Sequence, residues 1–153
     1  MFKNKLISIQ KLNKKLIKFK KNKKKIILKN FFFYILHSGH IKLLINSKKK
    51  GDILIVGLNS DKSFFLNKKK LPKFKFSLRS LYLSEIRSVD FVVKMNNQSP
   101  IDLLNEIRPH LHCKGGDYKK KNLLEYKFLK KMNIKIYIMP IKEKKISSSK
   151  ITL

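Results

Sequence analysis

Several residue types are scarce in this chain of 153 residues, and each scarcity excludes something. With one cysteine, Cys113, no disulfide can form within the chain, and the Cys and His residues show no zinc-binding spacing. The first absence favours a reducing, cytoplasmic setting. The second leads us to expect that the protein itself ligates no metal. The apolar runs are far shorter than the ~20 residues of a membrane-spanning helix, and no signal-peptide core is visible. We therefore expect a soluble protein that makes no membrane contact.

Acidic residues are also scarce, since 38 Lys and Arg face 9 Asp and Glu, a formal charge of +29. Such an excess first suggests nucleic-acid binding. However, only Arg79, Arg87 and Arg108 are arginines, and alanine and tryptophan are absent, a pattern typical of A+T-driven codon bias. The lysines also match no recognised RNA-binding module. We therefore expect nucleic acid not to be the partner.

The length is typical of a single domain with one hydrophobic core. Leu12, Leu16 and Phe19 are spaced four and three residues apart, which predicts an amphipathic helix over about residues 9–20. A helix lying on a membrane surface is the less favoured alternative to a helix packed on the protein. We expect a lysine-rich helical extension at residues 1–24, packed on a domain formed by residues 25–153.

From residue 25 onward, short apolar runs alternate with amphipathic segments and turns. This alternation predicts repeated strand–helix–strand units and hence a three-layer, Rossmann-like α/β sandwich with a parallel sheet. A loop is expected at residues 68–70. The expected strands are at residues 26–33, 53–58, 89–93, 111–114 and 134–139, and the expected helices are at 41–50, 77–87, 101–108 and 123–131.

Ligands of such sheets bind beyond the carboxyl ends of the strands, so the loops there are candidate sites. His37-Ser38-Gly39-His40 follows the first strand, with two histidines on one face of an opening helical turn. The free N–H groups of that turn favour a phosphate, although paired histidines can also serve only as a helix cap. Gly115-Gly116-Asp117 is a second candidate or a plain turn, and Ser147-Ser148-Ser149 is a phosphate-binding segment, an N-cap or a frayed tail.

Taken together, these loops resemble the HxGH nucleotidyltransferases, whose fold is the HIGH-type Rossmann-like sandwich. Within that group, the chain is most similar to the heptose 1-phosphate adenylyltransferases. The resemblance covers almost the whole chain, and all five glycines fall where the family pattern has glycine. It is carried by His37-Ser38-Gly39-His40, Gly57-Leu58-Asn59-Ser60-Asp61, Arg79 and Lys114-Gly115-Gly116-Asp117-Tyr118.

The resemblance implies a reaction and its partners. AMP would pass from ATP to heptose 1-phosphate, giving ADP-heptose and pyrophosphate for lipopolysaccharide precursor synthesis. Mg²⁺ would be carried on the triphosphate, without protein ligands. Because dimers are common in the family, we expect a homodimer.

The resemblance also implies roles for residues of this chain. His37, His40 and Arg79 would be catalytic. One of Lys68, Lys69 and Lys70 would bind a phosphate, and the sequence leaves open which one. The implied nucleotide-binding residues are Asn30, Phe33, Gly39, Asn59, Asp61, Lys114, Gly115, Gly116, Asp117, Ser147, Ser148 and Ser149.

The first loop departs from the family pattern at two positions. Phe31 stands in place of a glycine and Tyr34 in place of an acid, whereas Asn30 and Phe33 are retained. A bulky side chain near the triphosphate and the loss of a carboxylate both predict impaired activity. The alternatives are a glycerol-3-phosphate cytidylyltransferase-like enzyme, a degenerate transferase scaffold that binds nucleic acid through its lysines, and a folded remnant with little catalysis.

Overall fold

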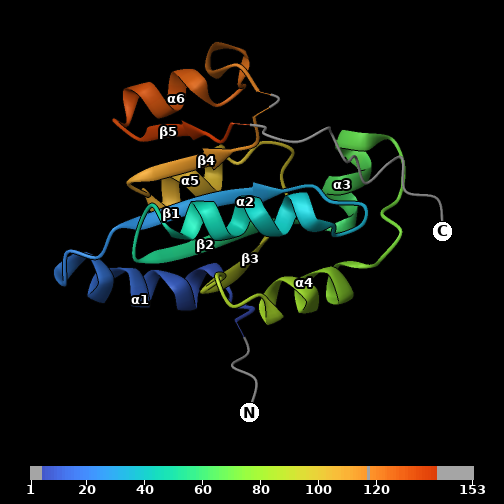
Figure 1. Cartoon of the computed structure of the whole chain (residues 1–153), viewed down its shortest axis with the longest axis horizontal. Coiled ribbons are helices and arrows are strands. Elements are labelled where there is room, and N and C mark those ends of the chain that lie inside the picture. Colours follow the sequence, from blue (N-terminus) through green and yellow to red (C-terminus); the bar gives the residue numbers. More distant parts are fainter. Residues whose placement is uncertain (1–4, 117, 141–153) are drawn as a thin grey trace.

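The fold is built on a sheet of five parallel strands in the order β3-β2-β1-β4-β5 (Figure 1). It is seen in a computed structural model that describes residues 5–116 and 118–140. The chain moves outward in one direction from β1 to β3 and then crosses to the other side of β1, so a topological switch point lies between β1 and β4. The strands are β1 (Ile26–Phe31), β2 (Ile53–Asn59), β3 (Phe91–Met95), β4 (Leu111–Lys114) and β5 (Lys135–Ile138).

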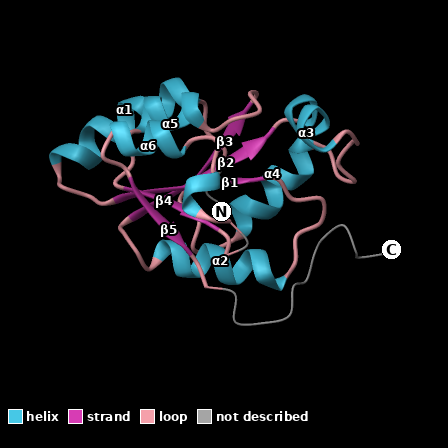
Figure 2. Cartoon of the chain, turned by 90° about the horizontal axis from the view of Figure 1, so that it is seen from above, coloured by secondary structure: helices cyan, strands magenta, loops and turns pink. Residues whose placement is uncertain are grey.

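Helices cover both faces of this sheet, which confirms the predicted three-layer α/β sandwich. Figure 2 shows α1, α5 and α6 on one side of the sheet and α2 on the other. Leu12 of α1 and Leu104 of α5 belong to one core cluster, whereas Leu44 of α2 and Leu83 of α4 belong to the second. The helices are α1 (Ile9–Lys21), α2 (Ser38–Lys48), α3 (Asp61–Lys68), α4 (Phe76–Glu85), α5 (Ile101–Ile107) and α6 (Tyr126–Lys131), with a 3₁₀ turn at Lys120–Asn122.

All six residues of β1 are buried. Alternate side chains of a strand point to opposite faces of its sheet. Accordingly, Ile26 and Leu28 enter the core beneath α1 and α5, while Ile27 and Phe31 enter the core beneath α2. This explains the near-continuous apolar run in the sequence, because a central parallel strand is covered on both sides.

The N-terminal segment is joined to the sheet at its β3 edge. Val92 of β3 exchanges backbone hydrogen bonds with this segment, donating to the Lys5 carbonyl and accepting from the Ile7 amide, both at 2.9 Å. The hydroxyl of Ser8 then caps α1, whose buried Leu12 and Leu16 pack into the core. The helix begins at Ile9, as the spacing predicts, and the boundary drawn at residue 24 stays a prediction.

Two of the differences from the sequence-based expectation concern the segments after β1 and β2. The first strand ends at Phe31 rather than at residue 33, although Phe33 is still fully buried, because the loop after the strand folds back onto the core. Helix α3 lies just before the loop expected at residues 68–70, in a stretch for which no element was predicted. Its apolar spacing is weak, because Phe64 is its only buried apolar side chain. The side chain of Ser60 caps its first turn.

Candidate active site

The two histidines of the first loop cap the start of α2 together. His37 Nδ1 accepts a hydrogen bond from the Gly39 amide at 3.1 Å, and His40 Nδ1 accepts one from the His37 amide at 3.3 Å. The two ring centroids are 3.8 Å apart. The capping interpretation is therefore correct as far as it goes. The cap uses only Nδ1 of each ring. Nε2 of each ring has no protein partner among the described residues.

Both rings are neutral near pH 7. Burial lowers the pKa of His37, and burial, with a further contribution from the Lys29 charge, lowers the pKa of His40 to about 3. A neutral imidazole that accepts at Nδ1 carries its proton on Nε2. The loop therefore offers two Nε2–H donors beside the N-terminus of α2, an arrangement suited to phosphate oxygens.

Phe31, the residue that replaces a family glycine, points into the core. Its side chain is 4% exposed and its ring lies edge-on to His40, with centroids 5.3 Å apart. Phe33 also packs against His40, at 5.8 Å. The aromatic ring thus supports the histidine from the inside of the protein.

Tyr34, the second departure, faces a lysine of the loop after α3. Lys70 Nζ lies 4.6 Å from the centroid of the Tyr34 ring, and Lys68 Nζ lies 5.7 Å from that of Phe32. Lys69, between them, has a left-handed backbone with φ of 56°. Two of the three candidate lysines are thereby held over the aromatic side chains of the first loop.

Arg79 is fully buried at the carboxyl end of β2. Its Nη2 donates to the Asn59 carbonyl at 2.9 Å and to Asp61 Oδ1 at 2.7 Å, and its Nε donates to the Phe74 carbonyl at 2.9 Å. Its ion-pair partner is Asp61. Arg79 therefore ties together the end of β2, the start of α3 and the loop before α4.

Two buried polar atoms beside this arginine lack a partner within the described part of the chain. One is Arg79 Nη1 and the other is Asn59 Oδ1. The amide nitrogen of Asn59 donates to Ser63 Oγ at 2.6 Å, and Asp61 Oδ2 accepts from the Phe76 amide at 3.2 Å. The predicted nucleotide-binding residues Asn59 and Asp61 are therefore largely occupied by protein contacts.

The carboxyl ends of β1 and β4 meet through the side chains of Asn30 and Lys114. Lys114 Nζ donates to Asn30 Oδ1 at 2.9 Å and forms an ion pair with Glu125 at 2.5 Å. Sequence reasoning missed Glu125, because a single glutamate in a lysine-rich helical segment has the pattern of a solvated residue. His112 contacts the same carboxylate.

The structure thus gathers most of the predicted residues at one edge of the sheet. Asn59 and Lys114 end their strands there, Asn30 is the last but one residue of β1, and His37 and His40 follow β1. The half-buried Gly115 and Gly116 come directly after β4. Asp117, Ser147, Ser148 and Ser149 lie outside the described residues.

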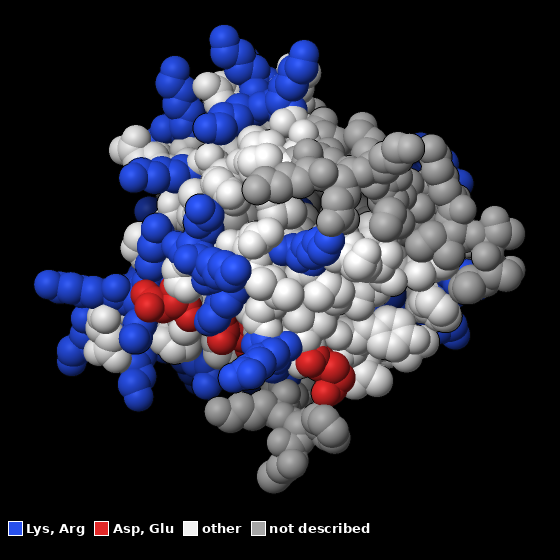
Figure 3. Space-filling model, viewed as in Figure 1, with Lys and Arg blue, Asp and Glu red and all other residues white. Residues whose placement is uncertain are grey.

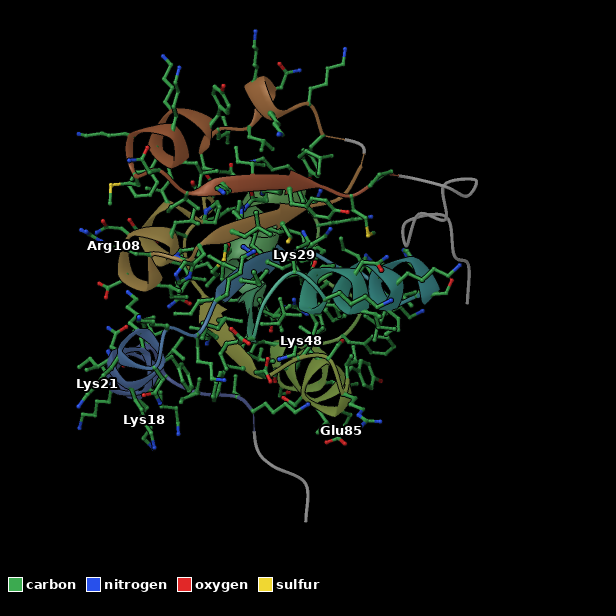
Figure 4. All side chains as sticks on the ribbon, turned by 60° about the vertical axis from the view of Figure 1, so that its left-hand side comes forward. Lys18, Lys21, Lys29, Lys48, Glu85 and Arg108 are labelled. Atoms are coloured by element: carbon green, nitrogen blue, oxygen red, sulfur yellow. The ribbon has the colours of Figure 1, made fainter. Side chains whose placement is uncertain are left out.

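The lysines contribute very differently to this arrangement. Figure 4 shows Lys18 and Lys21 extending outward from α1, whereas Lys29 lies in the interior of the molecule. Figure 3 shows many other Lys and Arg side chains on one face of the protein, with few acidic groups among them. Most of the positive charge is therefore solvated surface, and only a few lysines belong to the candidate site.

Comparison with known proteins places this fold and site in a family. The sequence model of the family described as cytidylyltransferase-like matches residues 32–152, and the chain belongs to that family. Among solved structures, it is similar to a lipopolysaccharide core biosynthesis protein from Thermoplasma volcanium, with a TM-score of 0.67 and 28% identity, covering 78% of this chain and 99% of that one. A pantoate-beta-alanine ligase from Francisella tularensis has the same fold, with a TM-score of 0.67 and 17% identity, covering 91% of this chain and 67% of that one.

Curated relatives are named bifunctional protein HldE. The one from Campylobacter concisus is 37% identical over 134 residues, which cover 87% of this chain and 28% of the relative. The one from Blochmanniella floridana is 39% identical over 126 residues, which cover 82% of this chain and 26% of the relative. The chain therefore spans about a quarter of the length of these relatives. Among the described residues, no helix is long and apolar enough to cross a bilayer.

The buried His112 predicts a pH dependence of stability. Burial lowers its pKa to about 4 from the ordinary value of 6.5, so below pH 6.5 the unfolded chain binds a proton that the folded chain excludes. The free energy of unfolding should fall between pH 6.5 and 4, by up to about 1.4 kcal/mol per pH unit from this residue. Urea unfolding of His112→Asn across this range should give a shallower pH slope than the wild type. Equal slopes would contradict the prediction.

Proposed function

We propose that this chain transfers AMP from ATP to heptose 1-phosphate, releasing pyrophosphate and forming ADP-heptose. The observation that carries the proposal is the pair of Nε2–H donors of His37 and His40 at the N-terminus of α2, next to the switch point of a parallel sheet. This is where such sheets bind ligands, and the donors suit an anion. The similarity to a lipopolysaccharide core biosynthesis protein supports a sugar-phosphate substrate. The relatives described as bifunctional are consistent with this chain providing one activity of the two.

In the proposed reaction, an oxygen of the sugar phosphate attacks the α-phosphorus of ATP in line with the bond to the leaving pyrophosphate. That oxygen is already anionic, so no general base and no covalent intermediate are needed. The protein positions both reactants and stabilises the charge that grows on the phosphate oxygens. His40 and His37 would donate from Nε2 to the α-phosphate and bridging oxygens, and the N-terminus of α2 would add its positive potential.

Other residues would hold the two substrates. We propose that Lys70 or Lys68 contacts the phosphates, since both already lie over the first loop. Arg79 would reach a phosphate through Nη1, the guanidinium nitrogen without a protein partner among the described residues. The nucleotide would lie against Gly39, Asn30, Phe33, Asn59, Asp61, Lys114, Gly115, Gly116 and Asp117, with its phosphates near Ser147, Ser148 and Ser149.

Mg²⁺ would neutralise the triphosphate and would arrive on the nucleotide. Within residues 5–116 and 118–140, no three His, Cys, Asp or Glu side chains gather in a way that could hold a metal ion. Asp61, an acidic residue of the proposed site, is engaged by Arg79 and the Phe76 amide. The donors present thus fit a metal bound through phosphate oxygens.

The test of this function is pyrophosphate release by the purified chain with Mg²⁺. ATP with heptose 1-phosphate should give release. The family description favours one rival, so CTP with glycerol 3-phosphate should be run beside it. Release only with the rival pair would assign the chain to cytidylyl transfer. No release in any pairing, from protein that melts cooperatively, would reject the transferase proposal. Light scattering of the same sample tests the proposed homodimer.

Replacing His40 by alanine should separate catalysis from folding. Removing one donor to the developing charge is expected to lower kcat about 10²–10³-fold. Loss of the cap should cost only about 1 kcal/mol of stability. The measurement is kcat for pyrophosphate release beside a thermal melt of the same preparation. If activity falls only in proportion to the folded fraction, the residue is structural.

Tyr34→Asp should raise turnover if the first loop has lost a useful carboxylate. The carboxylate would hold Lys70 by charge where the ring now holds it through its face. Tyr34→Phe keeps the ring face and is the matched control, with turnover expected to stay near the wild-type value. Phe31 is left in place, because removing a buried ring typically costs about 3–5 kcal/mol. Equal rates for Tyr34→Asp and the wild type would show that the acid is dispensable here.

A further inference from the structure

Five polar side chains are buried together where β1 and β4 end, and we call them the Lys114 cluster. They come from β1, from β4 and from the residue just before α6. Burial of charged and polar groups is costly unless they are paired and hydrogen-bonded. The members and their exposed fractions are Lys29 5%, Asn30 6%, His112 0%, Lys114 6% and Glu125 3%.

Glu125 is the anion at the centre of this cluster. One of its oxygens, Oε1, lies 2.5 Å from Lys114 Nζ and 3.2 Å from His112 Nε2. The same ammonium group donates to Asn30 Oδ1 at 2.9 Å. A continuous chain of contacts therefore runs from Glu125 through Lys114 to Asn30, and so from the start of α6 to the carboxyl end of β1.

The protonation states make this chain of contacts self-consistent. Burial alone would raise the pKa of Glu125, but hydrogen bonds from His112 and Lys114 and the Lys114 charge lower it to about 2. The carboxylate is thus ionised, and the neutral His112 donates to it from Nε2. The unpartnered atom of that ring, Nδ1, is then a bare acceptor. Burying an unpaired neutral acceptor costs less free energy than burying an unpaired charge.

The cluster lies directly behind residues assigned to the nucleotide. Lys114 is followed in the chain by Gly115 and Gly116, and Asn30 is the last but one residue of β1. The ammonium group of Lys114 already has two protein partners and is 6% exposed. It is therefore better placed to fix its neighbours than to reach into solvent for a phosphate.

We propose that Glu125 is a positioning residue of the nucleotide site, which acts by holding Lys114 against Asn30 and so sets the shape of the Gly115-Gly116 turn. This inference rests on the proposed function. Without the carboxylate, Lys114 is a buried cation with no counter-charge, and it must lose its proton or turn outward. Turning outward removes the donor to Asn30 Oδ1, and loss of the proton weakens the hydrogen bond that it makes. Either change loosens the turn, while the histidine pair on α2 is untouched.

The experiment compares Glu125→Gln with Asp90→Asn. Asp90 forms an ion pair with Lys48 that is also 2.5 Å long. It accepts a hydrogen bond from the Leu54 amide near the amino ends of β2 and β3, whereas the nucleotide site lies at the carboxyl ends of the strands. Calorimetry gives the Kd for Mg-ATP, and pyrophosphate release gives kcat and KM, all well below the melting temperature of each variant. Glu125→Gln should weaken ATP binding about 10-fold or more and raise KM in parallel, with kcat at saturating ATP near the wild-type value. Asp90→Asn should lower the melting temperature and leave both Kd and KM unchanged.

Two further results decide the proposal. Glu125→Asp keeps the charge on a shorter side chain, and its Kd should lie between those of the wild type and Glu125→Gln. If Glu125→Gln does not fold, this variant carries the test. A lowered melting temperature with an unchanged Kd, in either Glu125 variant, would make the role purely structural and overturn the proposal.

The calorimetric readout also separates this proposal from the proposed function. ATP binding that depends on Glu125, without pyrophosphate release by the wild type, supports the positioning role and rejects the transferase. Pyrophosphate release by the wild type, with the same Kd for Mg-ATP in the wild type and the Glu125 variants, supports the transferase and rejects the positioning role. Absence of any nucleotide binding to the wild type would reject both.

Discussion

The structure depends on one constraint, the burial of β1 on both faces at the centre of a parallel sheet. Its apolar side chains enter both cores, and its neighbours β2 and β4 lie on opposite sides of it. Because parallel strands end at the same edge, this arrangement brings the histidine loop, the end of β2 and the Lys114–Gly115 segment together. Strongly apolar packing of β1 thus holds in place a site made almost entirely of polar groups.

Those polar groups are themselves buried, and ion pairs offset the cost. Arg79 is charged and fully buried, and its Nε and Nη2 donate to Asp61 and two carbonyls. Glu125 is matched to Lys114 in the same way at the neighbouring strand end. In surroundings of low dielectric constant, removing one partner leaves an uncompensated charge, so each pair fixes its neighbours firmly. With so few acidic residues in the chain, it is notable that two of them serve this purpose beside the candidate site.

Much of the site could be predicted from the sequence, and the reason is local. His37 and His40 share one turn of helix, so their spacing alone places both rings together. The partners of Arg79 and the role of Glu125 could not be predicted in this way. Asp61 is 18 residues from Arg79, and Glu125 lies 11 residues beyond Lys114 on a segment whose path depends on how α6 packs. The side-chain direction of Phe31 could not be predicted either, because it depends on where β1 ends and on the position of Phe31 in the strand pleat.

By itself, the sequence determined the alternation of strands and helices, the parallel sheet, and the loops of the candidate site, because these follow from hydrophobic period and short motifs. Only the tertiary structure decided which buried charges pair, where Phe31 and Tyr34 point, and that α3 is a helix. Those outcomes depend on contacts between segments distant in the chain. Their energies come from packing and from a low local dielectric constant, which exist only once the sheet and its two helix layers have assembled.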